Sequence, residues 1–479
     1  MAPLVALRCP SDDTWSDVTR IAIVGGGPAG YEAALVAAQL GAEVTVIDSD
    51  GIGGACVLAD CVPSKTLIAT SESMTVIGDA YELGVRVPGG DGAATVDLPA
   101  ANARVKSLAR AQSDDISARL AREGIEVVAG MARFVAPNRL AVRTGSGAER
   151  GLDADAVLIA TGAHPRVLPG AEPDGERILS WRQVYDLDRL PEELVVIGSG
   201  VTGAEFASAY QGLGSHVTLV SSRDRVLPGE DVDAALLLES VFAAQGMTVL
   251  KRSRAAGVVR TSDGVLVTLE DGRTVEGTHA LLAVGSIPNT AGLGLDTVGV
   301  TTDAGGFVQV DRVSRTTAPG VYAAGDCTGV MLLASVAAMQ GRIAMWHTLG
   351  EAVTPLRLST VAANVFTHPE IATVGVGQTM VESGAVQAHA ITLPLATNAR
   401  AKMQGIEDGF VKLFSRPGTG TVLGGVVVGP RASELILGVS LAVQHNLTVD
   451  QVAHTFAIYP SLSGSLTEAA RQLMANSPV

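Results

Sequence analysis

The feature that most restricts the fold is a glycine-rich turn, Gly-Gly-Gly-Pro-Ala-Gly at residues 25–30, between two short apolar runs of which the second ends at Asp48. In a strand–turn–helix unit, Gly25 permits the tight turn, Gly27 lets the backbone approach a pyrophosphate, and Gly30 lets the helix pack on the strand. The helix N-terminus offers free N–H groups to phosphate, and the terminal acid can bind a ribose hydroxyl. The alternative is an ordinary glycine-rich turn, but the flanking strands and the acid favour a dinucleotide-binding unit.

A second copy of this pattern lies near the middle of the chain. An apolar run leads into Gly-Ser-Gly-Val-Thr-Gly, and a helical stretch and the apolar run 216–220 follow. The spaced glycines of this copy are Gly198, Gly200 and Gly203. Two such units in one chain indicate two dinucleotides held face to face, with electron transfer between them. The alternative is a duplicated fold with one empty site.

The residues after the outer strand of the second unit bear on the choice of nucleotide. Residues 221–225 are Ser-Ser-Arg-Asp-Arg. They place no carboxylate directly at the strand end, and they include Arg223 and Arg225. An acid at the strand end holds the ribose diol of NADH, whereas arginines accept a 2′-phosphate. We therefore expect NADPH to be accepted alongside NADH. The alternative is that both arginines face solvent.

Two cysteines lie shortly after the first unit, in the stretch Gly-Gly-Ala-Cys-Val-Leu-Ala-Asp-Cys-Val-Pro-Ser-Lys. Cys56 and Cys61 are five residues apart, and Lys65 follows them. A helix N-terminus and a nearby lysine lower the pKa of a thiol and make a cysteine pair exchangeable. The stretch predicts a redox-active disulfide. The alternative is two buried cysteines that never pair.

Composition limits the class of protein. A chain of 479 residues is too long for one ordinary core, and 55 glycines with few aromatic residues suit βα units. A net charge of −15 argues against a nucleic-acid surface. The longest apolar run is too short for a transmembrane segment. Four cysteines are too few for a secreted disulfide scaffold, so we expect a cytoplasmic protein.

Two further motifs follow apolar runs. The turns Ala-Thr-Gly at 160–162 and Ala-Val-Gly ending at Gly285 are expected where the chain crosses between nucleotide domains, since small residues let the backbone approach a ligand. A Gly-Asp turn then places Asp326 at a strand end, where its carboxylate can bind a cofactor hydroxyl. Such a turn alone is common.

The predicted fold class is α/β, with two doubly wound, Rossmann-like dinucleotide-binding domains and a C-terminal α+β domain used for dimerisation. The first dinucleotide-binding domain is expected in two parts, residues 20–160 and 285–355, with the second domain inserted at 161–284. Short strands alternate with helical stretches from 356 to 479, which indicates a domain of a different kind.

Together these motifs resemble the flavoprotein disulfide reductases, which include dihydrolipoamide dehydrogenase and glutathione reductase. The resemblance extends from about residue 20 to the C-terminus. It implies that FAD contacts Gly25, Gly27, Gly30, Asp48, Lys65 and Asp326. It also implies that NAD(P)H contacts Gly198, Gly200, Gly203 and Gly285. No metal site is expected.

The resemblance also assigns roles near the flavin. Lys65 is expected beside the flavin N5 and paired with Glu205, where its charge favours a hydride-bearing flavin and a thiolate. Cys61 is expected to be the flavin-proximal charge-transfer thiol and Cys56 the exchange thiol. The chain departs from the family pattern in this loop at Leu58 and Asp60, where members usually have Asn and Gly.

The most informative departure lies near the C-terminus. Members that act on disulfides have a His-Pro-Thr-x-x-Glu signature, and this chain has Tyr459-Pro460-Ser461 with Gly464 in the glutamate position. A phenol with a pKa near 10 is a poor acid/base at neutral pH, so exchange with an outside disulfide should be slow. His454 and Glu468 lie several residues out of register and are expected to be structural.

The sequence therefore predicts an FAD-dependent homodimer that passes electrons from NAD(P)H to quinones or similar small acceptors, which need no protein acid/base. In this respect it is similar to the lipoamide-dehydrogenase-like NAD(P)H:quinone reductase branch of the family. One alternative is dihydrolipoamide dehydrogenase or another disulfide reductase, with the base supplied from elsewhere. A second is a flavin-binding subunit without turnover.

Overall fold

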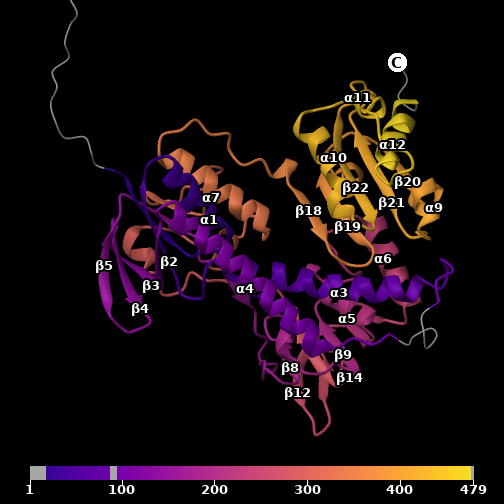
Figure 1. The fold of residues 1–479 in the computed structure, drawn as a ribbon, viewed down its shortest axis with the longest axis horizontal. Helices are drawn as coiled ribbons and strands as arrows, with labels where there is room; N and C mark the ends of the chain where they lie inside the picture. The colour runs from indigo at the N-terminus through magenta and orange to yellow at the C-terminus, as the bar shows by residue number, and fades with distance from the viewer. Residues whose placement is uncertain (1–17, 87–93, 476–479) are drawn as a thin grey trace, which may run out of the picture.

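The computed structural model describes residues 18–86 and 94–475, which form three units around three large sheets (Figure 1). The first sheet has the strand order β17-β6-β1-β2-β3-β4-β5. Its strands are β1 (Arg20–Val24), β2 (Glu43–Asp48), β3 (Glu126–Ala136), β4 (Arg139–Thr144), β5 (Glu149–Asp153), β6 (Ala156–Ile159) and β17 (Val321–Ala323). The strands from β17 to β3 are parallel, and β4 and β5 extend the sheet as an antiparallel meander.

Helices cover this sheet because its inner strands are apolar along their length and must be buried on both faces. The helices of this part of the chain are α1 (Pro28–Gln39), α2 (Gly54–Leu58), α3 (Cys61–Asp79), α4 (Leu98–Arg122) and α7 (Ala334–Thr348). α1 and α7 lie side by side (Figure 1). A Cβ on Gly341 of α7 would lie 2.2 Å from the Ala29 oxygen of α1, so glycine allows the two backbones to approach closely.

The second unit contains a five-stranded parallel sheet, β11-β10-β9-β15-β8, and a three-stranded antiparallel sheet, β12-β13-β14. Its elements are β8 (Ile178–Ser180), β9 (Glu193–Ile197), α5 (Val201–Leu213), β10 (His216–Val220), α6 (Val232–Ala244), β11 (Thr248–Leu250), β12 (Ala255–Arg260), β13 (Val265–Leu269), β14 (Thr274–Gly277) and β15 (His279–Leu282). Two short strands, β7 (Ala163–Pro165) and β16 (Ser286–Pro288), pair where the chain enters and leaves this unit.

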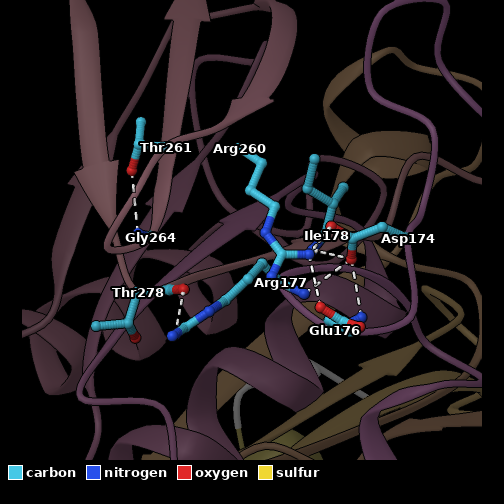
Figure 2. A network of polar contacts seen from close by, with 8 residues as sticks. All are labelled: Asp174, Glu176, Arg177, Ile178, Arg260, Thr261, Gly264 and Thr278. Carbon is cyan, nitrogen blue, oxygen red and sulfur yellow. Dashed lines mark hydrogen bonds and ion pairs between the residues drawn. The ribbon is translucent and has the colours of Figure 1, made fainter.

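A polar network fastens the small antiparallel sheet to the turn before β8 (Figure 2). Asp174 accepts hydrogen bonds from three successive backbone N–H groups, at 2.8, 2.8 and 2.9 Å, and so fixes the turn. Arg260 of β12 reaches this turn through ion pairs with Asp174 (3.5 Å) and Glu176 (2.6 Å). Arg177 donates to the Thr278 oxygen at 3.1 Å. These contacts are partly exposed and serve mainly to set geometry.

The third unit is an antiparallel sheet in the order β18-β19-β22-β21-β20. Its elements are β18 (Ala362–Val365), β19 (Glu370–Gly375), α8 (Gln378–Glu382), β20 (His389–Pro394), α9 (Ala399–Met403), β21 (Phe410–Ser415), β22 (Val422–Gly429), α10 (Ala432–Gln444), α11 (Val449–Ala453) and α12 (Gly464–Ala475). Ile436, Val439 and Val443 form the buried stripe of α10 at helical spacing. α10 contacts β19 and β22, and α12 contacts β20 and β21, which buries the sheet.

A buried ion-pair cluster joins the third unit to the second. Lys412 of β21 is only 1% exposed. Its Nζ lies 2.8 and 2.9 Å from the two carboxylate oxygens of Asp231 and 2.7 Å from Asp233. Asp231 is the N-cap of α6 and also accepts from the N–H groups of Asp233 and Ala234. The cluster therefore ties β21 to the first turn of α6.

The predicted fold class is confirmed: two mainly parallel sheets with βα connections precede an antiparallel sheet that packs against helices. Within residues 18–86 and 94–475, no helix is long and apolar enough to cross a membrane.

Candidate active site

The first glycine turn has the local geometry that its sequence requires. Gly25 has φ +112°, a conformation that glycine adopts readily. A Cβ on Gly25 would lie 2.2 Å from the Ala160 oxygen, so the turn packs directly against the end of β6. A Cβ on Gly30 would lie 1.8 Å from the Gly25 oxygen, which explains the close packing of α1 on β1. Gly27 is the extended N-cap residue of α1.

Asp48 has a contact set that the sequence pattern did not indicate. One carboxylate oxygen accepts from the N–H of Gly26 (2.6 Å), and the other accepts from Asp50 (2.8 Å) and Gly51 (2.6 Å). The acid at the end of β2 thus holds both the glycine turn and the loop that leads to the cysteines. It therefore positions the turn through contacts within the protein.

One cavity of about 460 Å³ joins the first glycine turn to the cysteine pair. Among the residues that line it are Gly25, Gly27, Asp48, Gly54, Cys56, Asp60, Cys61, Arg182 and Asp326. A Cβ on Gly54 would lie 2.8 Å from the Gly27 Cα, so the wall beside the glycine turn has no room for a side chain. The glycine turn suits a pyrophosphate, Asp48 and Asp326 suit hydroxyl groups, and the two thiols suit a redox-active ring. These residues fit FAD.

The two cysteines lie on neighbouring helices. Cys56 lies within α2, and Cys61 is the first residue of α3. Both are free thiols in this structure, and the Cys61 thiol donates to the Cys56 sulfur. This hydrogen bond lowers the pKa of Cys56, and the same bond together with burial raises the pKa of Cys61. The two thiols therefore titrate as one unit that shares a proton.

Lys65 and Glu205 form the predicted pair. Lys65 Nζ lies 2.7 Å from Glu205 Oε2, and the Glu205 side chain is 5% exposed. The other carboxylate oxygen of Glu205 accepts from the N–H of Phe366 at 2.9 Å, and Lys65 Nζ lies 4.9 Å from the centre of the Phe366 ring. Burial lowers the pKa of Lys65, but attraction to Glu205 and the hydrogen bond outweigh it, so the pKa is raised.

The second glycine turn repeats the first almost contact for contact. Gly198 has φ +110°, and a Cβ there would lie 2.2 Å from the Ala283 oxygen. A Cβ on Gly203 would lie 1.8 Å from the Gly198 oxygen. The N–H of Gly198 donates to Val220 (2.9 Å), as that of Gly25 donates to the residue before Asp48 (2.8 Å). The residue after Val220 is therefore the structural counterpart of Asp48.

That counterpart is Ser221, which is fully buried and whose hydroxyl lies 2.6 Å from the Ser199 hydroxyl. Beyond it, Arg223 is exposed, and its guanidinium has no hydrogen-bond or ion-pair partner among residues 18–86 and 94–475. Arg225 is half-buried and donates to the Pro228 oxygen at 3.2 Å. Arg223 is thus available to a ligand, whereas Arg225 is held within its own loop.

Gly285 follows β15, and Asp326 follows β17. Gly285 has φ +93°, a conformation that glycine adopts readily, and its oxygen accepts from the N–H of Arg166 (2.9 Å). Asp326 begins a short 3-10 helix and lines the cavity. Burial and the nearby charge of Asp60 raise the pKa of Asp326 to about 6.

Tyr459 lies apart from the cavity in this chain. It is 85% exposed, in a segment between α11 and α12 where Phe456 and Ile458 are 103% and 80% exposed. The two out-of-register groups nearby have local partners. His454 Nδ1 lies 2.8 Å from the Asp450 oxygen. Glu468 forms an ion pair at 2.6 Å, and the hydrogen bonds from Arg471 and Gln472 lower its pKa to about 2.

The fold and this site define a two-dinucleotide oxidoreductase with a cysteine pair, and comparisons with known families agree. Residues 19–341 match the family model for pyridine nucleotide-disulphide oxidoreductases, and residues 361–470 match its dimerisation domain. The chain belongs to this family. It is therefore an oxidoreductase, and the predicted family and cofactors, FAD and NAD(P)H, are confirmed.

Two curated proteins and one solved structure are similar to this chain over almost its whole length. An NAD(P)H dehydrogenase (quinone) of Mycobacterium tuberculosis is 59% identical over 468 residues, which cover 96% of this chain and 94% of that protein. The crystal structure of LpdA from Mycobacterium tuberculosis has a TM-score of 0.91 at 59% identity and covers 95% of this chain and 100% of that one. A dihydrolipoyl dehydrogenase of Chlorobaculum tepidum is 34% identical over 462 residues, or 96% of this chain and 97% of that protein.

Proposed function

We propose that this protein passes electrons from NAD(P)H through bound FAD to quinones or similar small acceptors. The observation that supports this most directly is the pairing of a complete cofactor cavity with Tyr459 and Gly464 in the positions of the family's acid/base pair. The 59% identical relative is named for a quinone activity. An acceptor that takes electrons directly from reduced flavin does not require the missing imidazole.

When bound, FAD supplies a centre that accepts a hydride from NAD(P)H and releases electrons singly or in pairs. The residues of the chain bind and orient the cofactors. Asp48 holds the glycine turn, and the Lys65 ammonium, fixed by Glu205, provides a positive charge in the site. That charge stabilises an anion formed nearby. The exposed guanidinium of Arg223 supports the use of NADPH alongside NADH, because arginine binds phosphate groups well.

We infer further that the protein is a cytoplasmic homodimer. The match of residues 361–470 to a dimerisation domain supports the second copy, and the low cysteine count supports a reducing compartment. By its resemblance to the family, the segment around Tyr459 approaches the cysteine pair of the second copy. Tyr459 then offers an aromatic ring and a weakly acidic hydroxyl at the mouth of the cavity in place of an imidazole.

Steady-state assays with NADPH and either a benzoquinone or lipoamide test the proposal. We expect benzoquinone turnover to exceed lipoamide turnover by at least about a hundredfold, because only the disulfide substrate needs the exchange base. Tyr459→His should raise lipoamide turnover and leave benzoquinone turnover nearly unchanged. Lipoamide turnover at hundreds per second by the parent protein would instead favour a dihydrolipoyl dehydrogenase. Absence of NAD(P)H-driven flavin bleaching would favour a subunit without turnover.

A further inference from the structure

Asp60 is a carboxylate placed directly beside the cysteine pair. It precedes Cys61 and is the N-cap residue of α3, where its side chain does not cap the helix. The backbone fixes its position, because its N–H donates to the Ala55 oxygen and its own oxygen accepts from Ser64, both at 2.7 Å. The residue is half-buried and lines the cavity with both cysteines. Its charge is thus held at the thiols.

The cations near Asp60 are engaged elsewhere. Lys65 pairs with Glu205 at 2.7 Å. Arg182 lies 3.9 Å from Asp50, and its guanidinium lies 6.0 Å from the Trp181 ring. Among residues 18–86 and 94–475, Asp60 itself has no hydrogen bond or ion pair through its carboxylate. The negative charge beside the thiols is therefore not neutralised by a direct contact.

This charge opposes what the start of a helix normally does for a thiol. The N-terminus of a long helix favours an anion, so Cys61 at the first position of α3 is in a place that stabilises thiolate. A carboxylate at the preceding residue repels a second anion there. The pKa values agree, because Asp60 acts to raise the pKa of both Cys56 and Cys61. Asp326 also acts to raise the pKa of Cys56, and Lys65 acts to lower the pKa of both thiols. The charged groups that act on Asp60 itself are Lys65, Glu205 and Arg182.

We propose that Asp60 is a positioning residue whose negative charge disfavours thiolate at Cys56 and Cys61 and so keeps their disulfide difficult to reduce. Breaking the S–S bond takes two electrons, which NAD(P)H supplies, and two protons if both sulfurs become thiols. When thiolate is disfavoured, reduction depends on uptake of both protons, and the disulfide accepts electrons less readily. Electrons then remain available to a quinone, a consequence that rests on the proposed function.

Two measurements on the FAD-loaded protein test this proposal, and neither needs a quinone. The first is the pH dependence of iodoacetamide alkylation of the reduced protein, followed separately for Cys56 and Cys61 by peptide mass spectrometry. Burial raises the pKa of the Asp60 carboxyl above its ordinary value, and the charge of Lys65 opposes that shift. The proposal therefore requires that the pKa of Asp60 stays below the range near about 8.5 in which thiols titrate. Asp60→Asn should therefore lower the midpoint of the more acidic thiol by about one pH unit, a tenfold gain in thiolate below it.

The second measurement is the equilibrium of the Cys56–Cys61 disulfide with dithiothreitol at pH 8. In Asp60→Asn the equilibrium constant for reduction should rise by up to about tenfold, because thiolate in the reduced form is stabilised. Asp60→Glu retains the charge and should stay within about twofold of the parent. Glu276→Gln removes an exposed acid on β14 in the second unit that is not among the groups acting on either thiol, and it should change neither measurement.

Two results would overturn the role of Asp60. One is an Asp60→Asn protein with normal flavin content whose thiol midpoints and dithiothreitol equilibrium match the parent. The other is an Asp60→Glu protein that changes as much as Asp60→Asn, which would assign the effect to shape and not to charge. Benzoquinone turnover of the parent protein is measured separately. Its absence would reject the quinone reductase function while leaving the thiol measurements interpretable.

Discussion

Single carboxylates in this protein have different environments although the sequence presents them alike. Asp48 accepts three backbone hydrogen bonds. Asp60 and Asp326 line the same cavity, and burial raises the pKa of both. Burial penalises the charged form, whereas N–H donors stabilise it. The role of an acid at this site therefore depends on whether backbone donors reach it, and residue type alone does not reveal that.

Asp326 should make the stability of the flavin-free protein depend on pH. Its pKa is about 6 when folded, against about 3.9 when unfolded. The folded state thus holds more protons between these values, and the free energy of unfolding falls as pH rises through them. Asp326→Asn removes this loss. Denaturant unfolding should show the variant gaining about 2 kcal/mol on the parent between pH 4.5 and 7.5.

A gain that is the same at both pH values would contradict this explanation, because an effect of packing does not follow protonation. Asp115→Asn provides the control, since Asp115 is an exposed acid on α4. Its difference from the parent should not change with pH.

At the scale of elements, the two glycine turns show which parts of a fold a sequence can predict. The requirement for a φ near +110° at Gly25 and Gly198 is local, because it follows from the turn itself. The pairing of Lys412 with Asp231 is not local. These residues are 181 positions apart, and nothing in either segment indicates the other.

The Lys412 cluster should contribute strongly to stability. Lys412→Met preserves much of the side-chain volume but leaves the Asp231 carboxylate buried without its cation. Breaking a buried pair in this way costs about 3–5 kcal/mol. Denaturant unfolding should show that loss. Lys106→Met is the control, because its pair with Asp186 is exposed and should contribute less than about 1 kcal/mol. Equal losses of unfolding free energy in the two variants would show that the buried cluster contributes no more to stability than an exposed ion pair.

The end of β10 should determine the choice of nucleotide. Ser221 occupies the place that Asp48 has in the first unit, so Ser221→Asp introduces a carboxylate where a 2′-phosphate is expected. We expect kcat/KM for NADPH to fall at least about tenfold relative to NADH. Arg223→Ala should lower kcat/KM for NADPH alone, and Arg225→Ala should have a smaller effect because Pro228 holds its guanidinium. A parent protein with a large preference for NADH would contradict the underlying assignment.

At the scale of the whole molecule, the sequence predicts the order of the sheets along the chain, but it does not predict the contacts between the units. The residues of a motif indicate only the conformation of the loop that contains them. Glu205 of α5, in contrast, receives a hydrogen bond from Phe366, which follows β18 in the third unit. The isolation of the Asp60 carboxylate depends on where Lys65 and Arg182 point after folding. Such contacts arise from packing of distant segments, which local spacing does not encode.

The exposed segment between α11 and α12 should bury against a second copy of the chain. Phe456 and Ile458 are large apolar side chains at 103% and 80% exposure within the dimerisation domain, and such groups seldom remain in water together. The double variant Phe456→Asp and Ile458→Asp should sediment as a monomer at concentrations where the parent is a dimer. Val259→Asp, an equally drastic change at an exposed site on β12, should remain a dimer. A double variant that also remains dimeric would place the interface elsewhere and would remove Tyr459 from the neighbourhood of the cysteines.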